Sequence, residues 1–158
     1  THPRSSAASD VYKRQTIRNK MKIKHITSIL FLFLCLFANV SNAEIKNIGN
    51  NEIKRLMSLG IPLIDVRRKD EWASTGVIEN SYLHTFFDKD GKYDLKSFIT
   101  NIKKISNSEK GIILFCRTGR RTTAIAKVLE KTNDFPEIYN TKGVKAWVLG
   151  DGKTVKYK

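Results

Sequence analysis

The chain has 158 residues, enough for one domain with additional tails, and its formal net charge is +14 at pH 7. The lysines are scattered along the chain without an interleaved aromatic pattern. We therefore expect a solvated basic surface and no nucleic-acid partner.

The first 20 residues show no apolar periodicity and precede a methionine, Met21, that could initiate translation. We expect residues 1–20 to be upstream sequence that does not belong to the native protein. A genuine basic extension is the alternative.

Residues 21–43 have the pattern of a signal peptide. Lysines at positions 22 and 24 precede an apolar run over residues 26–40, and a small-x-small cleavage site ends at Ala43. The apolar run is shorter than the roughly 20 residues that cross a bilayer, which favours cleavage after Ala43 over an uncleaved membrane anchor. We expect a periplasmic or secreted protein that begins at Glu44 and has no stable membrane anchor.

The predicted mature chain, residues 44–158, holds 22 lysines and arginines against 14 acidic residues, a charge of about +8. Cys35 leaves with the signal peptide, so Cys116 is the lone thiol and cannot form an internal disulfide. It is either reactive, intermolecular or a buried small hydrophobe. Only His84 remains among the histidines, so no zinc site of cysteines and histidines can form. We expect the His84 ring to form its hydrogen bonds within the protein or with solvent.

The first elements of the mature chain are short. Asn50 or Asn51 can cap a helix that stops at Gly60, and an apolar strand follows over residues 62–66. Residues 68–76 read as a helical turn and a loop, with Trp72 packed inward. A second strand lies around residues 81–84, and residues 88–92 have the composition of a turn.

The second half of the chain shows stronger periodicity. Asp94 precedes a helix whose apolar residues recur at helical spacing, namely Leu95, Phe98, Ile99, Ile102 and Ile105. Residues 111–115 are apolar throughout and predict a central strand. A helix over residues 122–131 and a strand over residues 137–140 follow. Gly143 then opens a last turn that contains Trp147.

Strands that alternate with helices predict an α/β fold, with a parallel sheet of four to five short strands and helices on both faces. Ligands of such sheets bind at the carboxyl ends of the strands. Cys116 is the first residue after the most buried strand. The sequence therefore predicts that its thiol lies in a strand-to-helix loop at the ligand-binding edge.

That loop reads Cys116-Arg117-Thr118-Gly119-Arg120-Arg121 and combines the thiol with fixed positive charge. Backbone N–H groups at the start of a helix are unpaired and form an anion site. Gly119 permits a tight curl, because it lacks a side chain. The amides, the helix dipole and the arginines all favour the thiolate over the thiol. This pattern predicts a nucleophile in a cup that accepts an anionic substrate or leaving group.

The loop resembles the active loop of rhodanese-like sulfurtransferases, with glycine three places and arginine five places after the cysteine. Residues 63–81 resemble the first signature of that family, with Asp65 and Arg67 in its aspartate-valine-arginine triplet. Residues 140–147 resemble its C-terminal signature. The resemblance covers nearly all of residues 44–158 and implies a rhodanese-like fold for that domain.

The resemblance also implies a thiosulfate sulfurtransferase-like activity. In the mechanism that it implies, the Cys116 thiolate would take sulfur from a small anionic donor such as thiosulfate, and the resulting persulfide would pass it to a thiol, a protein thiol or cyanide. We expect no cofactor, no metal and a monomer.

The loop residues receive separate roles. Arg117 and Arg120 are expected to orient the anionic donor, because planar guanidinium groups match oxyanions. Thr118, Gly119 and Arg121 belong to the same substrate-binding loop, and Arg121 is expected above all to brace it against Asp65 or Glu71. The residues expected to support the loop are Asp65, Arg67 and Thr122.

Two alternatives remain open. A cysteine phosphatase on the same fold requires an arginine after five intervening residues, whereas Arg121 follows Cys116 after four and Thr122 takes the next position. The shorter loop favours sulfur chemistry. The second alternative is a non-enzymatic sulfur-carrier or anion-binding module, which would form a persulfide without fast turnover.

Overall fold

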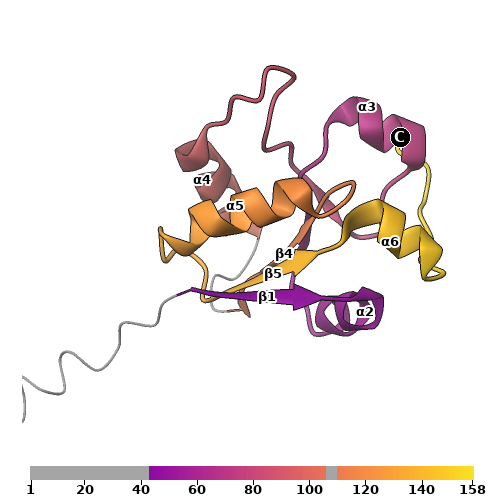
Figure 1. Cartoon of the computed structure of the whole chain (residues 1–158), viewed down its shortest axis with the longest axis horizontal. Coiled ribbons are helices and arrows are strands. Elements are labelled where there is room, and N and C mark those ends of the chain that lie inside the picture. Colours follow the sequence, from indigo (N-terminus) through magenta and orange to yellow (C-terminus); the bar gives the residue numbers. More distant parts are fainter. Residues whose placement is uncertain (1–42, 106–109) are drawn as a thin grey trace, which may run out of the picture. The chain divides into compact units, whose positions relative to one another are not determined.

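Five parallel strands form one sheet in a computed structural model that describes residues 43–105 and 110–158 (Figure 1). The strand order across the sheet is β1-β5-β4-β2-β3. The strands are β1 (Glu44–Ile48), β2 (Leu63–Asp65), β3 (Tyr82–Leu83), β4 (Ile112–Phe115) and β5 (Glu137–Thr141).

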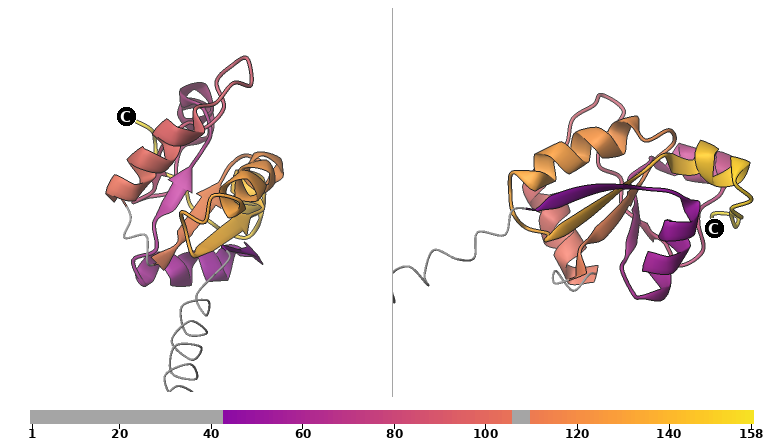
Figure 2. Two further views of the ribbon diagram at one scale, coloured as in Figure 1. Left: turned by 90° about the vertical axis from the view of Figure 1, so that its left-hand side faces the viewer. Right: turned by 60° about the horizontal axis from the view of Figure 1, so that its bottom comes forward.

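Helices cover both faces of this sheet (Figure 2). Those in the described ranges are α2 (Asn50–Ser58), α3 (Lys69–Thr75), α4 (Leu95–Ile105), α5 (Arg120–Glu130) and α6 (Gly143–Leu149). Apolar residues of α4 and α5 pack with Ile112 and Leu114 on one face. Apolar residues of α2 and α6 pack with Ile113 and Phe115 on the other. The alternation along β4 thus supplies both cores, as period-two side chains require.

Strand β4 is the central strand, paired with β2 on one side and β5 on the other. All four of its residues are fully buried, which explains its continuous apolar run. Because all the strands are parallel, their carboxyl ends meet at one edge of the sheet. The end of β4 lies in the middle of that edge.

The expected fold class is confirmed, including the parallel sheet with helices on both faces. Strand β1 was not among the strands assigned from the sequence; it pairs along β5, from Glu44 opposite Glu137 to Ile48 opposite Thr141. Its mixed polar composition reflects its position at the edge of the sheet, where only part of the strand is covered.

Two helix starts differ from the sequence expectation. The N-cap of α2 is Gly49, whereas Asn50 donates its side-chain amide to the carbonyls of Ala146 and Trp147. Helix α5 begins at Arg120, two residues earlier than expected. The expected cap of α4 is confirmed, because the Asp94 carboxylate accepts the backbone N–H of Ser97 at 3.0 Å.

Residues 1–42 lie outside the described residues, so the upstream segment and the signal peptide remain predictions. Of the signal-peptide pattern only its last residue, Ala43, is described, and it is buried. Over residues 43–105 and 110–158, no helix is long and apolar enough to cross a membrane.

Candidate active site

Cys116 follows β4 directly and is only 1% exposed. Its side chain joins the apolar cluster beneath α5, and it is a free cysteine. The Sγ atom accepts the backbone N–H of Gly119 at 3.1 Å. The chain therefore curls back over the sulfur and directs a hydrogen-bond donor at it, an arrangement that stabilises negative charge on sulfur.

Gly119 makes this curl possible. It is the N-cap of α5 and has a φ of 85°, in the left-handed region that favours glycine. A Cβ atom here would lie 2.9 Å from the carbonyl oxygen of Thr141 on β5. The turn places Arg120 and Arg121 in the first turn of α5, so their backbone amides belong to the positive end of the helix.

The start of α6 holds the outer side of the same loop. The N–H of Val144 donates to the carbonyl of Cys116 at 2.8 Å, and that of Lys145 donates to the carbonyl of Arg117 at 3.2 Å. Gly143 has a φ of 75°, and a Cβ atom there would lie 2.7 Å from the carbonyl carbon of Arg117 and would overlap the carbonyl oxygen of Cys116. Sequence reasoning missed this role of Gly143, although the residue lies in the C-terminal signature.

Thr122 is fully buried in the first turn of α5. Its hydroxyl lies 2.9 Å from the carbonyl oxygen of Gly119, 3.3 Å from that of Thr141 and 3.8 Å from the Cys116 sulfur. Thr122 therefore connects the loop to β5 through its hydroxyl. It does so from within α5, because the N-cap position is occupied by Gly119.

Arg121 forms a two-pronged ion pair with Glu71 on α3, with N–O distances of 2.6 and 2.7 Å. The same carboxylate accepts the backbone N–H of Arg68. Partial burial works to raise the pKa of Glu71, but the hydrogen bonds from Arg121 and Arg68 hold it below its usual range. The pKa of Arg121 is raised, chiefly by Glu71 and to a smaller extent by the charge of Cys116. Of the two expected partners of Arg121, the structure places Glu71 against it.

Asp65 and Arg67 form a fully buried pair beside the end of β4. The guanidinium of Arg67 also donates to the hydroxyl of Thr75 at 2.6 Å and to the carbonyl of Gly76 at 2.8 Å. In the described structure neither side chain hydrogen-bonds to residues 116–121. The pair holds the end of α3, the helix that carries Glu71, and so reaches the loop only indirectly.

Arg117 and Arg120 are exposed, and within the described ranges neither guanidinium has an ion pair or a side-chain hydrogen bond. Both line an open pocket of about 380 Å³, together with Arg68, Glu71, Thr118 and Arg121. Because Glu71 neutralises Arg121, the free positive charge of this pocket comes from the other two loop arginines. The pocket can accept a small anion.

His84 does not line this pocket. It is half-buried, its ring lies 5.3 Å from that of Phe98, and burial lowers its pKa. Among the described residues, no group of three or more His, Cys, Asp and Glu side chains could hold a metal ion.

A family model described as a rhodanese-like domain matches residues 49–149. A rhodanese-like domain protein from Staphylococcus aureus is 22% identical over 72% of this chain and 99% of its own, with a TM-score of 0.51. The polysulfide-sulfur transferase homodimer from Wolinella succinogenes is 22% identical over 75% and 83%, with a TM-score of 0.53.

A third solved structure, a protein of unknown function from Rhodopseudomonas palustris described as a possible tyrosine phosphatase, is 19% identical. It covers 73% of this chain and 88% of its own, with a TM-score of 0.52. At these identities the likeness establishes the fold alone. No curated protein matches the chain.

Proposed function

The chain belongs to the family of rhodanese-like domains, and we propose that it is a sulfurtransferase that carries sulfane sulfur on Cys116 as a persulfide. The observation that carries this proposal is the 3.1 Å hydrogen bond from the Gly119 amide to the Cys116 sulfur, at the positive end of α5. A thiolate is the nucleophilic form of cysteine, and the Gly119 amide is placed to donate a hydrogen bond to it.

Thiosulfate is the donor that we propose. The Cys116 thiolate attacks the outer sulfur, the S–S bond of the donor breaks, and sulfite leaves with the bonding electron pair. The negative charge then resides on the outer sulfur of the persulfide. An acceptor thiolate or cyanide attacks that sulfur, and Cys116 leaves as the thiolate. Covalent catalysis of this kind divides one difficult transfer into two easier steps.

The open pocket of about 380 Å³ that is lined by Arg117, Arg120 and Arg121 is called the donor pocket below. Its positive charge supports the proposal that the donor is an anion. Arg117 and Arg120 have no counterion in the described structure, so they are available to bind the sulfonate oxygens of thiosulfate. Arg121 is engaged with Glu71, which supports a bracing role for it rather than a direct grip on the donor.

A phosphatase function has less support from the geometry. The position at which a phosphatase loop would have its arginine is occupied by Thr122, whose buried hydroxyl contacts the carbonyls of Gly119 and Thr141. A threonine there cannot supply the two-pronged guanidinium contact that phosphate recognition uses.

Export is part of the same proposal. The signal-peptide pattern supports a mature protein that starts at Glu44 in the periplasm or outside the cell. Sequencing the N-terminus of exported protein tests it: recovery of a soluble cytoplasmic pool that retains Met21 would contradict it.

The activity is tested by comparing thiosulfate-to-cyanide sulfur transfer in the wild type and in Cys116→Ser. Serine nearly preserves the shape of cysteine but cannot form a persulfide, so turnover should fall below about a hundredth of the wild-type rate. A variant that retains more would show that another group carries the chemistry. A wild type that forms the persulfide but does not turn over would instead identify a sulfur carrier.

A further inference from the structure

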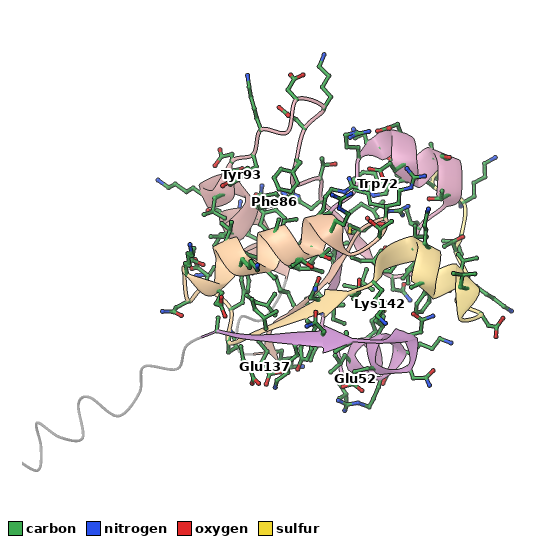
Figure 3. All side chains as sticks on the ribbon, in the orientation of Figure 1. Glu52, Trp72, Phe86, Tyr93, Glu137 and Lys142 are labelled. Carbon is green, nitrogen blue, oxygen red and sulfur yellow. The ribbon has the colours of Figure 1, made fainter. Side chains whose placement is uncertain are left out.

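A second hollow adjoins the donor pocket, between α3 and the outer side of the Cys116 loop. We call it the α3 pocket; its volume is about 280 Å³, and its lining includes Arg68, Asp70, Glu71, Ser74, Arg117 and Val144. Pockets for drug-sized ligands start at about 300 Å³, so this one has the size for a smaller molecule. Figure 3 labels Trp72 on α3 and Lys142, which directly precedes α6.

The polar groups of the α3 pocket divide into engaged and available ones. Glu71 is taken by Arg121 and by the Arg68 backbone. The carboxylate of Asp70 meets Arg68 at 3.1 and 3.2 Å but stays 66% exposed, so it can accept further hydrogen bonds. The hydroxyl of Ser74 and the guanidinium of Arg117 have no partner in the described part of the chain. The pocket therefore offers a carboxylate, that of Asp70, which can bind a cation, and a guanidinium, that of Arg117, which can bind an anion.

The wall of the α3 pocket is part of the Cys116 loop itself. Arg117 follows the cysteine directly and lines both pockets. Val144, on the same wall, donates its N–H to the Cys116 carbonyl at 2.8 Å. In a two-step transfer the first product leaves before the second substrate reacts. Arg117 can therefore bind an anionic group in each half-reaction in turn.

We propose, on the basis of the sulfurtransferase function above, that the α3 pocket binds the sulfur acceptor and that this acceptor is a small thiol with both an ammonium and a carboxylate group. The ammonium binds Asp70 and Ser74, and the carboxylate binds Arg117. The acceptor thiolate attacks the outer sulfur of the Cys116 persulfide. The S–S bond to Cys116 Sγ breaks, Cys116 leaves as the thiolate, and the acceptor becomes the persulfide.

The acceptor step can be measured apart from donor binding. The protein is loaded with thiosulfate, freed of donor and sulfite, and mixed with L-cysteine, cysteamine or 3-mercaptopropionate at equal thiolate concentration. Loss of the persulfide is followed by quenched-flow mass spectrometry. Cysteamine keeps only the ammonium and 3-mercaptopropionate only the carboxylate. Cysteine, which has both, should react on the order of ten-fold faster than either, because each charge-assisted contact contributes.

For each variant we compare the rate of persulfide loss with cysteamine to the rate with 3-mercaptopropionate. A change in the reactivity of the persulfide itself alters both rates equally and therefore cancels in their ratio. Asp70→Asn should lower this ratio roughly five- to ten-fold, because the ammonium loses its carboxylate partner. Arg117→Gln should raise it by a similar factor. Asp90→Asn, which removes an exposed acid in the turn at residues 88–92, should leave it unchanged.

The two proposals fail in different ways. If thiosulfate loads no persulfide, the sulfurtransferase function is overturned and the acceptor site with it. If the persulfide forms but the ratio is the same in the wild type, Asp70→Asn and Arg117→Gln, the acceptor proposal alone is overturned.

Discussion

Arg121 and Glu71 lie fifty positions apart in the sequence and meet through two hydrogen bonds of 2.6 and 2.7 Å. The contact joins the first turn of α5 to α3, and so connects the helix that begins at the Cys116 loop to the helix that lines the α3 pocket. It also neutralises one loop arginine. Arg117 and Arg120 remain as the free cations of the donor pocket in the described structure.

Replacing Arg121 by glutamine should destabilise the domain more than it weakens donor binding. The Arg121 and Glu71 side chains are only 24% and 15% exposed, and loss of one partner leaves a charge poorly solvated. We expect the free energy of unfolding to fall by about 1–3 kcal/mol. The matched control is Arg55→Gln, whose pair with Glu52 is 58% and 38% exposed and should contribute much less to stability, because solvent screens it. Equal losses in denaturant unfolding of the two variants would contradict the bracing role.

The stability contributed by Glu71 should depend on pH. Its pKa in the folded protein lies below the ordinary value of 4.5. Its contribution is therefore fully present above pH 4.5 and is lost as the pH falls through the folded-state pKa. Wild type and Glu71→Gln should differ in free energy of unfolding at pH 7 and converge below pH 4.5. The exposed Glu79→Gln is the control and should match the wild type across the range. A difference that stays constant down to pH 3 would show that the Glu71 charge is not involved.

Replacing Arg120 by alanine should raise the KM for thiosulfate while leaving the thermal midpoint nearly unchanged. The Arg120 guanidinium has no partner in the described structure, so its removal breaks no contact of the folded state. A charge-assisted contact to the donor corresponds to an increase in KM of on the order of ten-fold. Donor kinetics and thermal melting of the same preparation check this. An unchanged KM would mean that loop amides and the helix dipole bind the donor without Arg120.

Gly143→Ala should disrupt the Cys116 loop. A Cβ atom at Gly143 would overlap the Cys116 carbonyl, and the φ of 75° is unfavourable for alanine. Gly91 is the matched control, because its φ is 77° but no atom lies within 4 Å of a Cβ built there. Gly91→Ala should cost about 1–2 kcal/mol from backbone strain and leave sulfur transfer intact. Gly143→Ala should cost more and lose most of the activity. Equal activity in the two variants would show that the contact between α6 and the loop is not required.

The sequence was most informative about structural features that depend on one short segment of the chain. The apolar run before Cys116 identified the central strand, because a strand buried on both faces has no polar positions. The cysteine, glycine and arginine that follow then placed the thiol in the loop between that strand and the next helix, where the structure has it. Both features depend on residues close together in the chain.

Contacts between distant segments could not be predicted in the same way. Arg121 had two candidate partners, and only the tertiary fold places Glu71 rather than Asp65 against it. The hydrogen bonds from α6 to the loop carbonyls depend on how β5 ends beside β4. Strand β1 was missed because its partner, β5, lies about ninety residues later in the chain. Its own sequence mixes polar and apolar residues and gives no clear strand pattern.

The most direct test of the central claim is the mass of the purified protein before and after treatment with thiosulfate, followed by peptide mapping without reducing agent. The proposed chemistry predicts a gain of one sulfur atom on the peptide that contains Cys116, reversed by cyanide and absent in Cys116→Ser. A wild-type protein that gains no sulfur, or that gains it equally in Cys116→Ser, would contradict the assignment of Cys116 as the sulfur-carrying nucleophile.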